Sequence, residues 1–320
     1  MAIASVIKDI FRAGSPATAA IELLGLLHNL PGSWGGNGFN LIARPAKADS
    51  NGKNVFFLEL NGTQENLDFV TIAGDIPNRG DVEPTGLLHG IHYLQTVRDC
   101  EDKAFIHKEP GIWIHVPKTQ ENPSDTYVRQ ATIPHGDSLV AQSTFFTDPP
   151  IQGPPRIDPV DSFPIDINNP IPPLNDVTHA VLGGNYVTPY TTTPLPADCL
   201  PRGLDPAKTI KDPTEVLRAQ IASQTIKETV VIAISTVLPT LAGPLPLGAP
   251  TRPGGIVNIP FVVKNANASQ MDAIFWIEKV QHPTYPDREY MQLQYVQRVI
   301  LDFAGIHWPH ISVATLVKSA

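Results

Sequence analysis

Most of the chain alternates apolar and polar residues with a period of two, the pattern of half-buried β-strands. In the run MQLQYVQRVIL, Met291, Leu293 and Tyr295 share one face, while Gln294 and Arg298 lie on the other. We therefore expect this strand to have an apolar side and a side that faces water. Similar runs, rich in β-branched and aromatic residues, are GFNLIARP, NVFFLELNG, GIHYLQTV, GIWIHVP, TYVRQATI, TIKETVVIAIS, GGIVNIPFVVKN, MDAIFWIEKVQ and HISVATLVK.

These strands fall into two groups, residues 31–146 and 224–320, and neither group looks complete alone. Strands with one apolar face need a common core, and a closed sheet leaves no unpaired edge. The sequence therefore predicts an all-β fold. Both groups are expected to build a single closed antiparallel β-barrel of about ten strands.

The first part of the chain, residues 1–30, has a different period. Apolar residues recur at helical spacing, and Ser15-Pro16 resembles an N-cap followed by proline at the first helical position. We expect two short helices that pack on the barrel. No basic cluster precedes an apolar run, and no stretch reaches the roughly 18 uninterrupted apolar residues of a membrane span. A soluble, cytoplasmic protein without a membrane partner is expected.

The segment 147–223 is rich in proline and interrupts the strand pattern. Fifteen of the 33 prolines lie between residues 147 and 213, and proline disfavours both helix interiors and central strands. Either a disordered linker or an ordered excursion wrapped on the barrel fits this composition, and the apolar residues and tyrosines of VLGGNYVTPY favour the excursion. Asp212-Pro213-Thr214-Glu215 is typical of a helix start and predicts a short helix in EVLRAQIASQ.

Composition narrows the class of protein. The hydrophobic fraction of 42% supports a core, and the net charge of −8, from 23 basic and 31 acidic residues, provides no overall basic surface for nucleic acid. Cys100 and Cys199 could pair, but two cysteines do not make the disulfide framework of a small secreted domain. A reducing compartment is expected. Cys-x-x-Cys-His, a phosphate-binding loop and Gly-x-Ser-x-Gly are all absent.

Four segments, in this order, resemble the nitrobindin family of heme-binding β-barrels, which are related in shape to fatty-acid-binding proteins. LPGSWGGNGF resembles the opening strand of that family, with its Gly-x-Trp-x-Gly element. The central hairpin, with His-x-Glu-x-Gly, is matched by GIHYLQTVRDCEDKAFIHKEPGIWIHVP, the late hairpin by MDAIFWIEKVQHPTYPDREYMQLQYVQ and the closing strand by PHISVATLVK. The chain would be an enlarged, calycin-like member with a Pro-rich insertion.

The resemblance implies a heme b cofactor with His310 as the metal ligand. The local pattern agrees, because a strand would place His310 on one face with Ser312, Ala314 and Leu316, which are small or apolar. The alternative is a histidine that caps the strand in solvent or is satisfied in the core. His307, three residues earlier, is the rival axial ligand or a neighbour that hydrogen-bonds the true one.

Further candidates are expected around the cofactor. Simple alternation places His107, Glu109, Trp113 and His115 on one face, although Pro110-Gly111 favours a break in register. As an inward set they would supply a distal donor and an acid, with His107 catalytic and Trp113 in contact with the cofactor. The alternative is a hairpin whose polar residues organise its turn.

His135 is the second catalytic candidate, as a histidine at the barrel mouth or in contact with a heme propionate. Its alternative is an ordinary turn residue. Arginines could pair with heme propionates, since their forked guanidinium matches a carboxylate. The candidates are Arg44, Arg79, Arg129 and Arg298, and Arg129 is the one assigned to cofactor binding. The alternative for each of them is an ordinary surface charge.

The leading hypothesis is a heme protein whose open iron face binds NO, peroxide or peroxynitrite. The resemblance implies a peroxynitrite isomerase-like activity, and a peroxidase-like oxidoreductase acting on an apolar organic substrate is the other enzymatic form. A metal-free barrel that carries a fatty-acid-like ligand is the alternative. A scaffold whose Pro-rich excursion binds partners is the third hypothesis.

Overall fold

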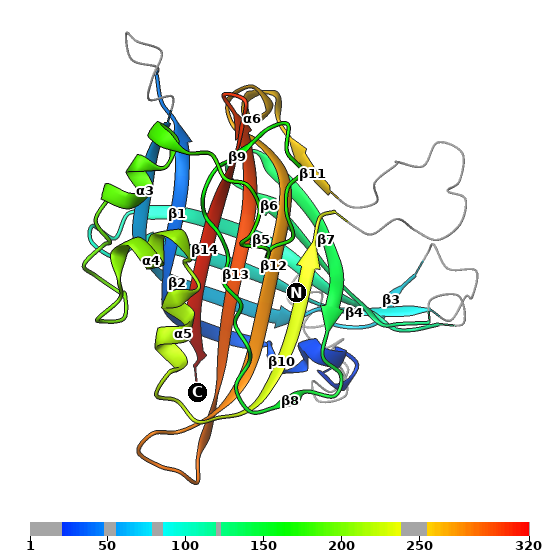
Figure 1. Cartoon of the computed structure of the whole chain (residues 1–320). Helices are drawn as coiled ribbons and strands as arrows, with labels where there is room; N and C mark the ends of the chain where they lie inside the picture. The colour runs from blue at the N-terminus through cyan, green and yellow to red at the C-terminus, as the bar shows by residue number, and fades with distance from the viewer. Residues whose placement is uncertain (1–20, 48–55, 79–85, 120–122, 238–254, 320) are drawn as a thin grey trace, which may run out of the picture.

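The computed structural model describes residues 21–47, 56–78, 86–119, 123–237 and 255–319 (Figure 1). Ten long antiparallel strands dominate it. They are β1 (Gly32–Pro45), β2 (Phe56–Thr71), β4 (Leu87–Asp99), β5 (Phe105–Val116), β6 (Thr126–Ile133), β7 (Asp137–Phe146), β10 (Ile226–Ser235), β12 (Asn267–Gln281), β13 (Glu289–Phe303) and β14 (Ile306–Lys318).

The strands close into one barrel. Their order is β7-β6-β5-β4-β2-β1-β14-β13-β12-β10, and β10 returns to β7 with Ile232 opposite Phe146. β11 (Gly255–Asn258) pairs with the part of β7 that lies beyond the end of β10, and so extends the edge formed by β10. The predicted all-β fold with a single closed barrel is confirmed, because strands from both ends of the chain are needed to close it.

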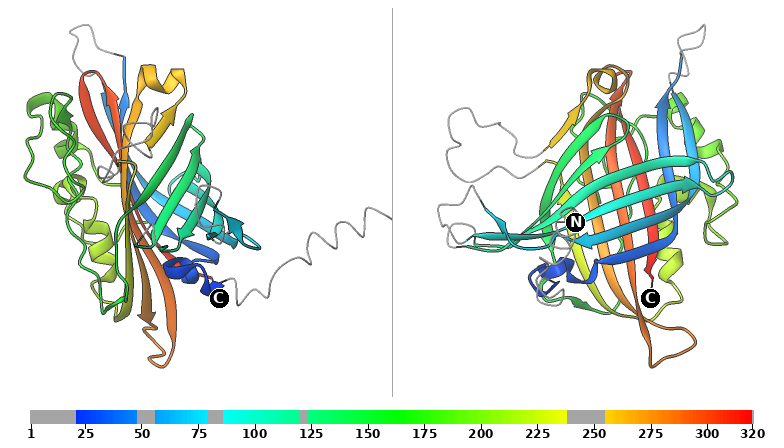
Figure 2. Two further views of the ribbon diagram at one scale, coloured as in Figure 1. Left: turned by 90° about the vertical axis from the view of Figure 1, so that its right-hand side faces the viewer. Right: turned by 180° about the vertical axis from the view of Figure 1, so that it is seen from behind.

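A short 3-10 helix, η1 (Gly25–Asn29), closes one end of the barrel. Figure 2 shows it at that end, next to the start of β1. Leu24, Leu27 and Leu30 are buried among apolar side chains of the lumen, and the Leu26 backbone N–H donates to Tyr127 Oη at 3.1 Å. This part of the N-terminal region therefore packs on the barrel, while the first of the two expected helices, which precedes Ser15, lies outside the described residues.

The Pro-rich segment is ordered and lies outside the barrel. Its helices lie against β1, β2 and β14, and its extended chain crosses β13 and β12 (Figures 1 and 2). It is built from short elements joined by extended chain. They are β8 (Ile151–Gln152), β9 (Ile165–Asp166), η2 (Gly184–Tyr186), α3 (Thr188–Thr192), α4 (Pro206–Lys211) and α5 (Glu215–Ile221), the helix expected after Pro213. A second apolar core, which includes Tyr190, Leu217, Trp276 and Trp308, joins this excursion to the outer face of the barrel.

One expectation about β13 is wrong, because the excursion covers its outer face. Its polar face was expected to meet water, but Gln292, Gln294 and Arg298 are all at most 2% exposed. Arg298 donates to Asp272 Oδ2 at 2.7 Å and to the carbonyl of Pro172 at 2.8 Å. The polar residues of this strand are therefore hydrogen-bonded beneath the excursion, which period-two alternation cannot reveal.

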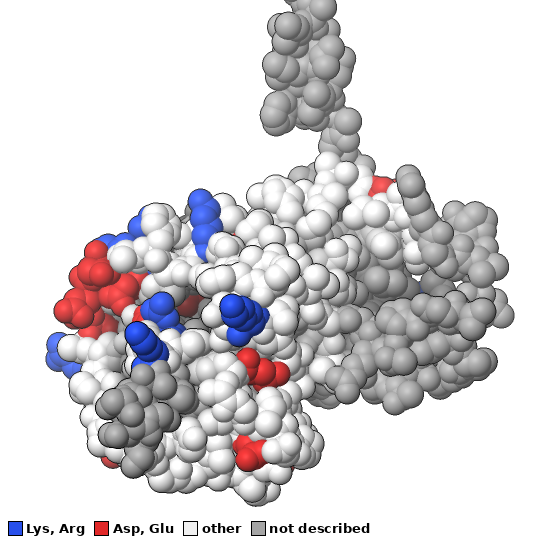
Figure 3. All heavy atoms as spheres, turned by 90° about the horizontal axis from the view of Figure 1, so that it is seen from above, with Lys and Arg blue, Asp and Glu red and all other residues white. Residues whose placement is uncertain are grey.

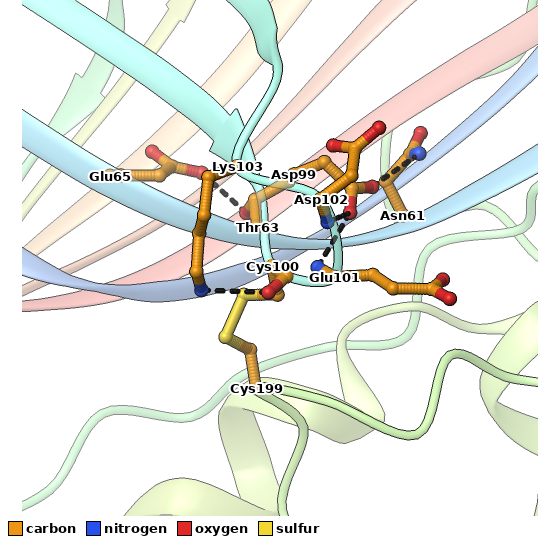
Figure 4. Close-up of a disulfide and its surroundings, with 9 residues drawn as sticks. All are labelled: Asn61, Thr63, Glu65, Asp99, Cys100, Glu101, Asp102, Lys103 and Cys199. Atoms are coloured by element: carbon orange, nitrogen blue, oxygen red, sulfur yellow. Dashed lines mark hydrogen bonds between the residues drawn. A yellow bond between two sulfur atoms is a disulfide. The ribbon is translucent and has the colours of Figure 1, made fainter.

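A disulfide between Cys100 and Cys199 ties the excursion to the β4–β5 turn (Figure 4). Disulfides persist mainly in oxidising environments, so the structure does not support the expectation of a reducing compartment. Localisation therefore stays a prediction. None of the helices in the described ranges has the length and apolar composition needed to cross a membrane.

Glu278 is an ionisable group buried between the barrel and the excursion. Its side chain lies on the outer face of β12, where Oε2 accepts a hydrogen bond from Gln292 Nε2 at 2.6 Å. Oε1 has no partner among the described residues. Burial raises the pKa of Glu278 to about 7, against the lowering effect of the Gln292 hydrogen bond. Ionising this carboxyl therefore costs folding free energy.

We expect loss of the disulfide to lower stability without opening the barrel. The bridge closes a loop between residues 99 positions apart, for which chain entropy gives an upper value of about 4 to 5 kcal/mol. The apolar core beneath the excursion stays intact in Cys199→Ser. Urea denaturation with and without reductant measures the difference. Two free thiols in the purified, unreduced protein would show that the bridge does not form.

We expect Glu278→Gln to stabilise the protein in a pH-dependent way. The carboxyl of the unfolded chain releases its proton near the ordinary glutamate pKa of 4.5, whereas the folded one keeps it until about pH 7. Wild-type stability therefore falls across this window, by on the order of 3 kcal/mol, and the Gln variant escapes that fall. Urea denaturation at pH 4.5, 6 and 8 tests this.

The control is Glu228→Gln on the neighbouring strand. Its carboxylate is one third exposed and lies 3.8 Å from Lys279 Nζ, an arrangement worth only about 0–1 kcal/mol. Equal pH profiles for wild type and Glu278→Gln would contradict the burial cost assigned to Glu278.

Candidate functional site

The lumen end opposite η1 is polar, and His310 on β14 lies within it. His310 Nε2 is 2.7 Å from Asn40 Oδ1, and Ser312 Oγ donates to the same oxygen at 3.0 Å. Ala314 and Leu316, further along the strand, lie in the lumen core. The four residues that alternation placed on one face therefore do share the lumen side.

His107 and His135 reach this end of the lumen from the opposite wall. His107 lies near the start of β5, and His135 lies in the turn between β6 and β7. Their rings are 5.6 Å apart. Burial, followed by the charges of His107 and His135, lowers the pKa of His310 to about 3. His310 is therefore a neutral imidazole at neutral pH, the form that binds a metal.

A buried ion pair between Glu109 and Arg129 lies next to His107 and is hydrogen-bonded to it. Glu109, 1% exposed, accepts from Arg129 Nη2 at 2.5 Å through Oε1 and from His107 Nε2 at 3.1 Å through Oε2. Tyr93 Oη donates to Glu109 and accepts from Arg129 Nε at 2.8 Å. Burial alone would raise the pKa of Glu109, but Arg129 and His107 outweigh it and hold the pKa well below its usual range.

The register of β5 explains how these groups meet. The expected break at Pro110-Gly111 is wrong, because β4 and β5 pair without interruption from His89–His115 to Val97–His107 and shift only after Val97. A Cβ on Gly111 would lie 2.4 Å from the Tyr93 ring. Glycine at this position therefore lets the Tyr93 hydroxyl reach Glu109, and His107 and Glu109 share the lumen face as alternation predicted.

A second buried carboxyl, Glu65 on β2, has no cationic partner in the described structure. It accepts from Tyr295 Oη at 2.6 Å, Thr63 Oγ1 at 2.9 Å and Gln95 Nε2 at 3.1 Å. Burial outweighs these hydrogen bonds and raises the pKa of Glu65. This residue was not among the predicted site residues, although alternation along β2 places it on the lumen face with Leu67.

Other predicted residues lie elsewhere. His307 bonds Asp302 Oδ1 at 2.5 Å at the start of β14, and Trp113 packs edge-on against Phe275 in the apolar part of the lumen. His115 stacks on Tyr127 next to η1.

The arginines proposed for propionates are also engaged. Arg129 is paired with Glu109, which leaves its cofactor-binding role without support. Arg44 pairs with Glu59 and Arg298 is covered by the excursion. Arg79 lies outside the described residues.

The rim of this lumen end carries apolar side chains. α6 (Pro260–Asn265) packs beside the turn that bears His135, where the Ile259 N–H donates to the Gly136 carbonyl at 2.9 Å. Val257, Phe261 and Val263 are more than half exposed. Figure 3 views this end and shows acidic side chains gathered at one edge beside a broad uncharged area.

No protein-family model matches the sequence, and no curated protein matches it. Eight chains among the solved structures match. One is the crystal structure of Rv2717c from M. tuberculosis, which is 12% identical, covers 96% of this chain and 99% of its own, and has a TM-score of 0.39. The closed ten-stranded antiparallel barrel is established by the strand pairing itself. The resemblance to nitrobindin stays a prediction.

We expect Arg129→Met to destabilise the protein by about 3 to 5 kcal/mol, because it leaves the Glu109 carboxylate buried without its cation. Arg44→Met is the matched control, since Arg44 and Glu59 form an exposed pair worth about 0–1 kcal/mol. Adding Glu109→Gln to Arg129→Met should recover part of the loss. Urea denaturation measures all four proteins, and equal losses for the two single arginine variants would refute the expectation.

Proposed function

We propose that this protein binds heme b at the polar end of the barrel, with His310 as the axial ligand and the opposite iron face open to a small ligand. One observation carries the proposal: a half-buried, neutral imidazole on β14 lies in the same lumen end as His107 and His135, which come from the opposite wall. Neutral histidine is the usual axial ligand of heme iron in globins and peroxidases.

The donor set fits a heme better than a bare metal ion. No group of three His, Cys, Asp or Glu side chains within the described ranges is arranged to hold a metal. An iron ion bonded to His310 would therefore need a porphyrin to supply its other donors. His310 Nε2 is hydrogen-bonded to Asn40, but Nδ1 makes no hydrogen bond to a described residue. One ring nitrogen is therefore available as the ligand.

Bound heme would supply reversible ligand binding and redox chemistry. The chain's own residues prepare the lumen for it. The Glu109 carboxylate, fixed by Arg129, orients His107 by accepting from Nε2. Burial raises the pKa of Glu65, although the hydrogen bonds that its carboxyl accepts lower it. The lumen thus offers an oriented histidine and a buried acid to a peroxide or nitrogen-oxide ligand. We propose that these two groups assist conversion of that ligand if the protein is an enzyme.

The alternative, a metal-free carrier of a fatty-acid-like ligand, is less well supported. Such a carrier needs a cation for the ligand's carboxylate, and Arg129 is the natural choice in this lumen. Its guanidinium is already paired with Glu109 at 2.5 Å and bound to Gln297 Oε1 at 2.6 Å. A second carboxylate would meet no free charge there.

We expect His310→Ala to abolish heme binding or to weaken it severely, while His307→Ala and His135→Ala retain most of it. His307 is the matched control, since it is a histidine of the same strand that is bonded to Asp302. Hemin titration followed at the Soret band measures affinity at equal loading. Far-ultraviolet circular dichroism checks that the three variants stay folded.

A wild-type Soret position and affinity in His310→Ala would refute the axial assignment. A wild-type protein that binds no hemin and releases lipid on extraction would instead support the carrier.

A further inference from the structure

A chain of side chains runs from the surface of the barrel to His310. Asn61 Nδ2 donates to Asp99 Oδ2 at 2.9 Å, and Asn40 Nδ2 donates to Asn61 Oδ1 at 3.4 Å. Asn40 Oδ1 then lies 2.7 Å from His310 Nε2. The chain joins β4, β2, β1 and β14, which are neighbours in the sheet order.

The carboxylate at its outer end fixes the direction of every hydrogen bond. An ionised carboxylate only accepts, so Asn61 must turn its amide nitrogen toward Asp99 and its oxygen toward Asn40. Asn40 must then donate to Asn61, which leaves its oxygen facing His310. His310 can meet that oxygen only with an Nε2–H group, and a neutral imidazole then has its lone pair on Nδ1.

The outer end of the chain is firmly held. Asp99 Oδ1 accepts from the backbone N–H of Glu101 at 2.7 Å and of Asp102 at 3.3 Å. Partial burial would raise the pKa of Asp99, but the hydrogen bonds from Asn61 and these N–H groups outweigh it and lower the pKa. Figure 4 shows Asp99 and Asn61 joined beside the Cys100–Cys199 bridge, which anchors the same turn.

We propose that Asp99, Asn61 and Asn40 are positioning residues that hold His310 as the Nε2–H tautomer, so that Nδ1 is the nitrogen presented to a ligand. The assignment of the tautomer stands on the hydrogen-bond chain alone. Only its last step, that the ligand is heme iron, rests on the proposed function.

The opposite arrangement is disfavoured by the same geometry. Reversing Asn40 would put its oxygen against Asn61 Oδ1, and reversing Asn61 as well would put an amide oxygen against the Asp99 carboxylate. Two acceptors in contact gain no hydrogen bond and repel each other. Ser312 does not decide between the arrangements, because a hydroxyl can donate or accept.

Long-range proton–nitrogen correlation spectra of the ¹⁵N-labelled, heme-free protein test the tautomer directly. The His310 signals are identified by their absence from His310→Ala. We expect a protonated Nε2 and an unprotonated Nδ1 in wild type, and a mixture of tautomers in Asp99→Ala.

Asp102→Ala is the control, since its carboxylate bonds the Ala104 N–H in the same turn and does not touch Asn61. A protonated Nδ1 in wild type, or an unchanged tautomer in Asp99→Ala, would overturn the proposal.

Resonance Raman spectra of the ferrous, heme-loaded protein test the last step. A stronger acceptor on the far ring nitrogen raises the basicity of the ligating one, so Asn40→Asp should raise the iron–histidine stretching frequency, and Asp102→Ala should not. An unchanged frequency in Asn40→Asp would exclude Nδ1 ligation. Failure of wild type to bind heme would refute the proposed function alone, because the nitrogen spectra decide the tautomer without heme.

Discussion

The pairing of β10 with β7 is the constraint on which the rest of the structure depends. It joins strands from before and after the Pro-rich excursion into one closed sheet, and closure divides the side chains into a lumen set and an outer set. Several polar side chains of the lumen then bond one another across the barrel. Tyr93, Arg129 and Glu109 bond one another, and Tyr295 and Gln95 both bond Glu65.

Burial of so much polarity at one end of a barrel is costly. An apolar lumen, such as the one formed by Trp34, Phe69 and Trp113 at the η1 end, would stabilise the fold at lower cost. Placing a charged pair, an unpaired carboxyl and three histidines at the other end therefore points to function, since perturbed ionisable groups gather at functional sites. The excursion adds stability from outside without obstructing the lumen, because it packs on the outer face of the barrel.

Local pattern predicted the strands, the barrel and the shared lumen face of His310 and Ser312, because period-two alternation depends only on neighbouring residues. It also placed His107 and Glu109 correctly, although the proline–glycine pair between them and Trp113 argued for a break. Contacts between side chains of different strands could not be predicted from this pattern. Ser312 and Asn40 are 272 positions apart, and the meeting of Asn61 with Asp99 depends on the register of β2 against β4.

The same limit applies to the outer face. Nothing in the alternation of β13 shows that a distant segment will cover Arg298, because Pro172 approaches it from 126 positions away. The pairing of Cys100 with Cys199 likewise depends on how the excursion returns to the β4–β5 turn.

The most direct test of the central claim is a crystal structure of the protein loaded with hemin. We expect the iron to be bonded to His310 inside the lumen, with His107 and His135 on the side of its open position. Hemin bound outside the lumen, or coordinated by His307, would contradict the claim.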